Sequence, residues 1–194
     1  MNEGYFYGIL DLFFAEMTTE ETSTAAPTYG KPQVLGKSIE VTLTPGYREG
    51  KLHASNATVR NTKKIDTYTV SLHADKIPHA VQKVLLGRPV DGNGVQIIKG
   101  KNVPPKVAVG FACTLDDGSK ELWWLYKGEF SEMTKSAKTD GDAIEYQTPT
   151  IEGVFVRRMN DDALAAVVDT SSEGIGADVE KNWFTEVYEE TAAA

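Results

Sequence analysis

The chain has 194 residues, of which 41% are hydrophobic and 25% are charged. This length suits one domain with a substantial core, and the composition is typical of folded globular proteins rather than of disordered or fibrous ones. The net charge of −8 argues against phosphate binding as the main activity, because an acidic surface repels phosphates.

The chain opens without the features of an export signal. Residues 1–5 carry no basic region followed by a long apolar stretch, and no apolar run in the chain approaches the roughly 18 residues of a membrane helix. We therefore expect neither secretion nor membrane insertion. A strand is predicted over residues 8–16, and residues 17–31, rich in Thr, Glu, Ala and Gly, are predicted to form an exposed loop.

Two stretches alternate strictly between apolar and polar residues. In residues 38–44 the apolar positions are Ile39, Val41 and Leu43, and residues 67–74 follow the same period of two. Because successive side chains of a strand point to opposite faces, this period predicts half-buried strands.

The segment between these strands, residues 45–64, shows no such pattern. A patternless stretch of about 20 residues inside a compact domain is either functional or disordered. We predict a long inter-strand loop here, and it carries five basic residues: Arg48, Lys51, Arg60, Lys63 and Lys64.

A helix is predicted to begin near Pro78, since proline suits the first helical position. The apolar residues from Ile77 to Leu85 recur with helical spacing, and Gly87 suits the stop that follows a helix.

The next two strands are joined by a tight turn. Residues 106–114 alternate again, and Asp116-Asp117-Gly118 favours a hairpin, because Asp and Gly tolerate positive φ. The return strand, residues 121–126, is apolar on both faces. Such a strand is expected to be covered on both sides.

The last predicted elements are strands over residues 145–158 and 164–168 and a short helix over residues 178–187. Pro149 fits the second-last strand only at an edge or bulge, because it has no amide to donate. The elements together predict a mainly β fold, a β-sandwich or barrel-like domain spanning residues 1–194 with one clear flanking helix.

Sequence motifs for cofactor or metal binding fail on spacing. Gly36-Lys37-Ser38 ends like a phosphate-binding loop, but the glycine that this loop requires is replaced by Lys31. Asp91-Gly92-Asn93-Gly94 resembles a calcium loop, but Val95 and Asn102 stand where oxygen ligands are needed. His53, His73 and His79 show no ligand spacing. We expect no cofactor and no metal.

No catalytic constellation emerges either. Cys113 is the single cysteine, so no internal disulfide can form and a reducing place of synthesis is expected. It lies in the apolar phase of its strand, which favours a core residue over a nucleophile. Trp123 and Trp124 cannot form one sugar-stacking platform, because adjacent strand residues face opposite ways. The sequence therefore predicts that the protein is not an enzyme.

Six strings, in order along the chain, resemble the phi13-type major tail proteins of bacteriophages. The strings are Gly8-Ile9-Leu10-Asp11-Leu12-Phe13-Phe14-Ala15, Pro78-His79-Ala80-Val81-Gln82-Lys83-Val84-Leu85-Leu86-Gly87, Val107-Ala108-Val109-Gly110-Phe111, Trp124-Leu125-Tyr126-Lys127-Gly128-Glu129-Phe130-Ser131, Tyr146-Gln147-Thr148-Pro149-Thr150 and Asn182-Trp183-Phe184-Thr185. Residues 1–7 and 189–194 depart from the family and are expected to be flexible ends. Residues 17–31 match poorly, so their role stays open.

The resemblance implies the tail tube subunit of a long-tailed phage, a siphovirus. Such subunits form hexameric rings that stack into a hollow tube, assembled around a tape-measure protein, through which viral DNA passes during ejection without sequence-specific binding. The implied partners are further copies of the chain, the tape-measure protein, the tail terminator and the distal tail or baseplate proteins. The implied location is the virion tail, after assembly in the cytoplasm of the host bacterium.

The same resemblance suggests roles for charged residues. In related tube proteins a long loop reaches adjoining subunits, and here that role would fall to residues 45–64, whose basic side chains would meet an acidic surface on the next ring. An acidic lumen wall would let DNA slide. The strand-borne candidates for that wall are Glu40, Glu121, Glu129 and Glu152. Ordinary solvated strand faces and a plain mobile loop are the alternatives.

A different class of function stays open at this point. A β-sandwich binding module for carbohydrate or surface adhesion would act as a monomer, and exposed aromatic residues would favour it. Rings or hollow rods in electron micrographs would distinguish the tube subunit from this alternative.

Overall fold

The structure is a computed structural model. It describes residues 5–54, 57–135, 139, 148–172, 174–176 and 178–191, and gives the backbone alone for residues 52–54 and 57–59. Part of the predicted strand 145–158 and parts of the two predicted flexible ends lie outside the described residues.

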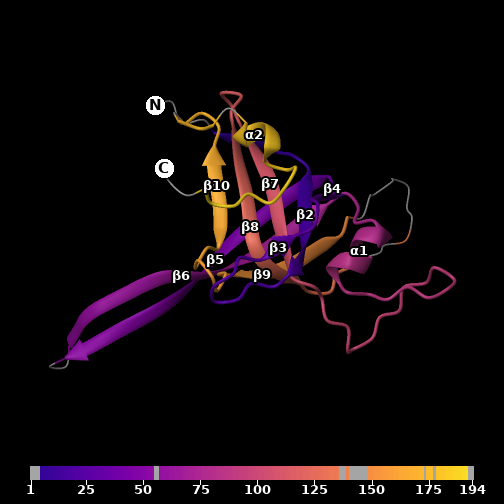
Figure 1. Cartoon of the computed structure of the whole chain (residues 1–194), viewed down its shortest axis with the longest axis horizontal. Coiled ribbons are helices and arrows are strands. Elements are labelled where there is room, and N and C mark those ends of the chain that lie inside the picture. The colour runs from indigo at the N-terminus through magenta and orange to yellow at the C-terminus, as the bar shows by residue number, and fades with distance from the viewer. Residues whose placement is uncertain are drawn as a thin grey trace.

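The described chain folds mainly into β-strands, as the sequence predicts, and the strands form one large antiparallel sheet (Figure 1). Its main path runs β3-β2-β7-β8-β9-β6-β5, with β1 on β7, β10 on β8 and β4 on β2. The elements are β1 (Phe6–Ile9), β2 (Leu12–Thr19), β3 (Thr28–Tyr29), β4 (Gln33–Gly36), β5 (Ser38–Ala54), β6 (Ala57–Ala74), α1 (His79–Leu85), β7 (Val107–Leu115), β8 (Lys120–Phe130), β9 (Thr150–Val156), β10 (Ala165–Asp169) and α2 (Val179–Asn182).

A bulge in β8 divides the sheet into two parts whose strands run in different directions. Val109 of β7 pairs with Leu125, whereas Val107 pairs with Gly128, so β8 holds one extra residue between these two pairs. Before the bulge β8 pairs with β10, and after it β8 pairs with β9. Because a bulge bends and twists its strand, β9, β6 and β5 run across the direction of β7, β8 and β10 (Figure 1).

One face of the sheet holds the main core. The cluster joins β2, β6, β7, β8 and β9 through residues such as Leu72, Phe111 and Phe155. Helix α1 adds Val81 and Leu85 to it, as the helical spacing predicts. The helix ends at Leu85, and Gly87 takes φ +56° just beyond it, which confirms the predicted stop.

A second core covers the opposite face of β7 and β8. The C-terminal segment lays Trp183 and Val187 on Leu122, Trp124 and Tyr126 of β8. Trp124 Nε1 donates to the Trp183 carbonyl at 2.8 Å. The doubly apolar strand is therefore covered on both sides, as predicted. The predicted helix 178–187 is shorter, however, because α2 ends at Asn182 and gives way to turns.

Several sequence predictions need correction. Residues 45–64 do not form a patternless loop: the described part is the outer half of the long β5–β6 hairpin. The loop predicted over residues 17–31 contains the end of β2 and the short strand β3. The outer hairpin gives no strand signal because strands that bury neither face on a core carry no alternating pattern. Strand β3 gives none because it has only two residues.

Backbone pairing or an ion pair joins the described part of each end to the body. Phe6 pairs with Leu115 through β1, and Glu189 forms an ion pair with Arg158 at 2.7 Å. No helix among the described residues is long and apolar enough to cross a membrane.

Candidate self-assembly surfaces

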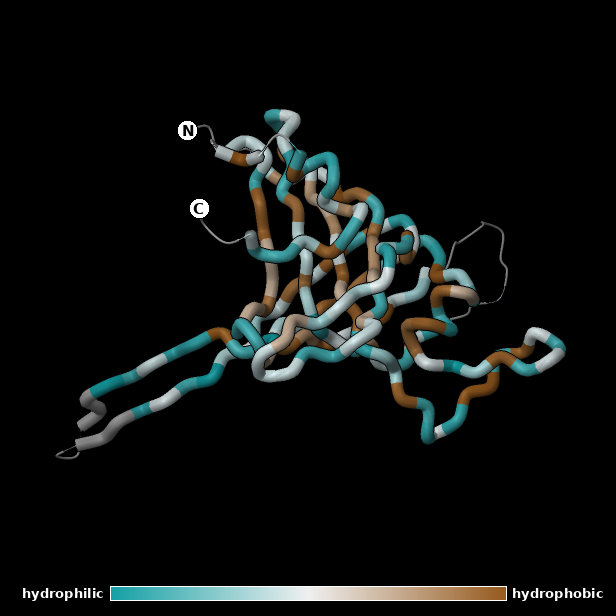
Figure 2. The backbone as a smooth tube through the Cα atoms, viewed as in Figure 1, coloured by the Kyte–Doolittle hydropathy of each residue, from teal (hydrophilic) through white to brown (hydrophobic). Residues whose placement is uncertain are grey.

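The most prominent surface is the projecting hairpin, defined here as residues 45–54 and 57–66. Strand β9 pairs with β6 only from Thr67 to His73, so beyond this point β5 and β6 pair with each other alone. At about 3.3 Å per residue, ten residues extend roughly 30 Å from the sheet. Figure 1 shows this hairpin, also called the arm below, leaving the body, and Figure 2 shows that it is mostly hydrophilic.

Cross-strand pairing distributes the five predicted basic residues over both faces of the arm. Arg48 pairs with Lys64, and Arg60, four residues before Lys64 on the same strand, lies on the same face. Lys63 pairs with Glu49, and Lys51 pairs with Asn61 on the other face. The hairpin therefore brings the five residues onto one arm, but not onto one face.

The basic residues near the base of the arm are neutralised. Arg48 contacts Asp66 at 3.1 Å, and Arg157 from the body contacts the same carboxylate at 2.8 Å. The hydrogen bond from Arg157 lowers the pKa of Asp66 below its ordinary value. This arrangement ties the arm to the sheet.

Further out, the positive charge is less compensated. Lys63 lies 3.6 Å from Glu49 and 4.0 Å over the ring of Tyr47. Within the described residues, Lys51, Arg60 and Lys64 enter no ion pair. The outer part of the arm thus carries uncompensated basic side chains, although the whole chain has a net negative charge.

Three of the four predicted acidic residues share one face of the sheet. Glu40 pairs with His73, and Glu152 pairs with Ser71, two residues away on the same strand. Val154 follows Glu152 on this face and pairs with Glu129 of β8. Residues that pair across strands point the same way, so the three exposed carboxylates lie on the outer face, opposite the main core.

Glu121 lies apart from the other three. It pairs with Cys113, on the core side of β8 before the bulge, and accepts a hydrogen bond from Trp123 Nε1 at 2.5 Å. The bulge reverses which residues of β8 face the core, so Glu121 and Glu129 point to opposite faces. Glu121 therefore cannot share one surface with Glu40, Glu129 and Glu152.

The outer edge of β5 is a third surface. Strand β5 ends the path of the sheet, and no other described strand pairs with its second edge. Open edges offer backbone donors and acceptors to another chain. A 17-residue edge is long enough to bind a strand from another chain.

The residues with reactive side chains do not form a site. Burial raises the pKa of the Cys113 thiol, which disfavours the thiolate, and the side chain packs against the main core. Among the described residues no group of three His, Cys, Asp or Glu side chains is arranged to hold a metal ion.

Sequence reasoning missed two exposed apolar features. One is the loop between α1 and β7, and the other is the aromatic start of β1, where Tyr5, Phe6 and Tyr7 are exposed. Exposed isoleucines and valines in a loop without periodicity give no strand or helix signal. Their number in a loop that also carries Gly and Pro was the only available sign.

Comparison with known proteins gives one family match. The profile of the phage tail tube protein family matches residues 46–172, more than half of the chain. Among solved structures, the chain is similar to the anti-feeding prophage cap, a tube-terminating cap, with 10% identity, a TM-score of 0.47, and coverage of 87% of this chain and 94% of that chain. No curated protein matches the sequence. The family is a structural one and not an enzyme family. The resemblance drawn from the sequence is confirmed: this chain belongs to the phage tail tube protein family, structural components of the virion tail.

Proposed function

We propose that the chain closes into hexameric rings, and that these rings stack into the hollow tail tube of a long-tailed phage, a siphovirus. The observation that carries this proposal is the pair of unpartnered β surfaces, the free edge of β5 and the projecting hairpin. A monomeric protein normally protects such edges, because they recruit other chains.

The free edge of β5 supports lateral closure of the ring. A neighbouring copy that adds a strand there extends the sheet by main-chain hydrogen bonds alone. When every copy contributes the same edge and the same receiving strand, the contact is heterologous and closes into a ring at a fixed rotation.

The projecting hairpin supports contact between copies that do not share this edge. Its reach of roughly 30 Å exceeds the spacing of strands within a sheet many times over. Lys51, Arg60 and Lys64 meet an acidic surface on the adjoining ring, and opposite charges there set the orientation of stacking.

The acidic outer face supports the role of a conduit. We assign Glu40, Glu129 and Glu152 to the lumen wall and leave Glu121 out, because its carboxylate binds Trp123 on the other face. Carboxylates repel the phosphates of DNA, so the genome slides through without sequence-specific binding.

The remaining partners follow from a tube of this kind. A tape-measure protein occupies the lumen during assembly, a terminator closes one end, and distal tail or baseplate proteins attach at the other. Assembly takes place in the cytoplasm of the host bacterium. The chain needs no cofactor for any of these contacts.

Deleting the arm tests the proposal. Residues 49–63 are replaced by Asn-Gly, which forms the two-residue turn that a hairpin favours between the paired residues Arg48 and Lys64. Because the described side chains of the arm contribute nothing to either core, the variant is expected to keep a cooperative unfolding transition and to stay monomeric under conditions in which the unmodified chain forms tubes.

A charge variant keeps the length of the arm and so tests its charge separately. Lys51, Arg60 and Lys64 are each replaced by Gln, which keeps the arm but removes its uncompensated charge. Tubes of this variant are expected to form less readily, with a weaker dependence on salt. Normal tubes from the deletion variant would rule out the arm's role.

A further inference from the structure

The loop between α1 and β7, residues 86–106, exposes apolar side chains away from the body. It projects at the opposite side of the molecule from α2 and the start of β1 (Figure 1), and Figure 2 shows several hydrophobic segments along it. Ile98 is 64% exposed and Val103 76% exposed. Val90, Val95 and Ile97 add further exposed apolar surface.

The loop is held in one shape by its own hydrogen bonds. The Asp91 carboxylate accepts from the amides of Asn93 and Val95 at 2.8 and 2.9 Å. The Ile97 amide donates to the Pro89 carbonyl at 3.0 Å. Because these contacts already order the backbone, the loop loses less conformational entropy when it binds a partner.

Buried polar contacts fix the base of the loop. Arg88 is buried and contacts Gln82 at 3.3 Å, Gln96 at 3.5 Å and Glu132. Gly87 has φ +56°, and a Cβ there would lie 2.4 Å from the Val103 carbonyl. The exposed apolar side chains of residues 86–106 are therefore carried by a well-ordered loop.

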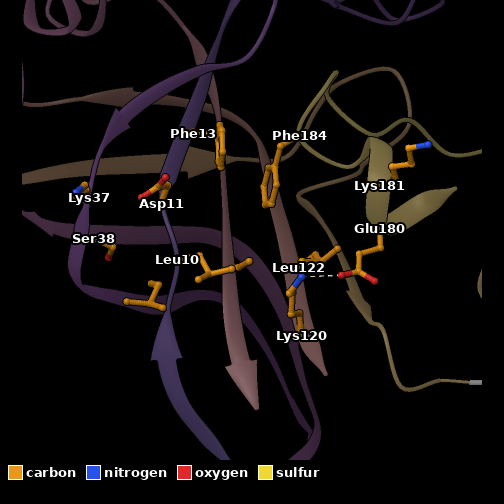
Figure 3. Close-up of a pocket in the computed structure, with 12 residues that line it drawn as sticks. Leu10, Asp11, Phe13, Lys37, Ser38, Lys120, Leu122, Glu180, Lys181 and Phe184 are labelled. Atoms are coloured by element: carbon orange, nitrogen blue, oxygen red, sulfur yellow. Dashed lines mark hydrogen bonds and ion pairs between the residues drawn. The ribbon is translucent and has the colours of Figure 1, made fainter. Parts of the chain in front are cut away.

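A groove of matching character lies at the other side of the molecule. Its volume is about 770 Å³, within the range of roughly 300–1,000 Å³ typical of binding pockets. Leu10, Phe13, Leu122 and Phe184 line it (Figure 3), and the rings of Phe13 and Phe184 stack at 4.4 Å. Leu10 is 44% exposed.

The rim of the groove has mixed charge. Lys120 forms an ion pair with Glu180 at 2.8 Å, and Lys181 points away from the apolar floor (Figure 3). Asp11 and Lys37 also line the groove, and neither is in an ion pair among the described residues. The Asp11 carboxylate is thus available to a cation brought by an incoming chain.

We infer that residues 95–101 of the loop dock into this groove on a second copy of the chain. Ile97 and Ile98 enter the apolar floor, and Lys99 or Lys101 meets Asp11; within the described residues neither lysine has an ionic partner. Because loop and groove lie on opposite sides of the subunit, the contact is heterologous and repeats from copy to copy. The inference rests on the proposed function in that both require copies to associate.

Cysteine cross-linking tests the contact directly. Ile98→Cys and Leu10→Cys are combined in a Cys113→Ala background, and the protein is oxidised at a concentration at which electron micrographs show rings or rods. A ladder of disulfide-linked species beyond the dimer is expected on non-reducing gels. Either cysteine alone is expected to give no dimers, and Val167→Cys with Leu10→Cys, which pairs the groove with an exposed residue of β10, is expected to give no ladder.

A second variant measures the contribution of the contact. Ile98→Asp places a charge in the apolar floor, and it is expected to raise the concentration needed for assembly at least tenfold while the unfolding midpoint stays unchanged. Val167→Asp is the matched exposed control.

The outcomes separate the two proposals. Assembly without the ladder, or Ile98→Asp assembling like the control, overturns the docking inference and leaves the tube proposal standing. A chain that never associates at any concentration overturns both.

Discussion

Arg158 is the most heavily engaged charged residue of the body. Its buried guanidinium contacts Glu189 at 2.7 Å, binds Asp161 and lies 4.0 Å over the ring of Tyr126. It therefore joins the end of β9, the following turn and the C-terminal segment. Burial alone would lower the pKa of Arg158, but the hydrogen bonds that its guanidinium donates to Glu189 and Asp161 outweigh burial and raise it.

Removing this guanidinium leaves its acidic partners uncompensated. Arg158→Met is expected to lower the free energy of unfolding by about 1–3 kcal/mol, measured by urea denaturation, because the charge-assisted hydrogen bonds of the buried guanidinium are lost. Arg157→Met is the control and is expected to cost clearly less, because Arg157 is more exposed and water screens its ion pairs with Asp66 and Asp162. Equal losses for the two variants would contradict this account.

Asp161 makes the stability depend on pH. Burial raises its pKa, but hydrogen bonds from Arg158 and from the Ala163 amide outweigh burial and leave the pKa below its ordinary value. A carboxyl whose pKa is lower in the folded state stabilises the fold above its unfolded pKa, and this contribution is lost as pH falls through the folded pKa.

The free energy of unfolding is accordingly expected to fall as pH drops below about 4. Asp161→Asn cannot titrate, so its stability is expected to change less over the same range. Denaturation curves between pH 3 and pH 6 for both proteins measure the difference. Parallel curves would show that Asp161 is not responsible.

At the scale of elements, the bulge in β8 controls the shape of the sheet. Gly128 lies at the bulge, and a Cβ there would be 2.5 Å from the ring of Phe155. The close approach of backbone and ring allows β9 to pack against β8 where the sheet changes direction.

Gly128→Ala is therefore expected to destabilise the fold by about 1–3 kcal/mol, because Phe155 has to leave its place in the core. Gly50→Ala, with open space around its Cβ position in the projecting hairpin, is the matched control and is expected to be neutral. Thermal unfolding measures both. A stable Gly128→Ala protein would show that the ring can move without cost.

The elements that the sequence predicts well are those that bury one face. Val70, Leu72 and Ala74 alternate with polar residues because one side of β6 packs on the main core. The outer halves of β5 and β6 were missed because neither face of the arm is covered, so polar residues occupy both. Pro45, Gly46 and Gly50 also lie in β5, where sequence rules argue against a strand.

The grouping of the four predicted acidic residues could be predicted only in part. Strand assignment alone could not say that Glu121 and Glu129, eight residues apart on one strand, face opposite ways. That difference depends on the bulge near Gly128, which leaves no pattern in the sequence. The groove leaves no pattern in the sequence either, because its lining residues come from segments that only the fold brings together.

At the scale of the whole molecule, the surfaces without intramolecular partners matter most. No described strand pairs with the free edge of β5, and the outer part of the projecting hairpin and the apolar loop extend from the body in different directions (Figure 1). In a chain of the tail tube family, such surfaces fit contacts with identical copies.

Negative-stain electron microscopy of the purified chain over rising concentration tests this central claim most directly. The account predicts ring-shaped particles with six-fold symmetry, and hollow rods of constant width at the highest concentrations. Small separate particles at every concentration, with the chain fully folded, would contradict it.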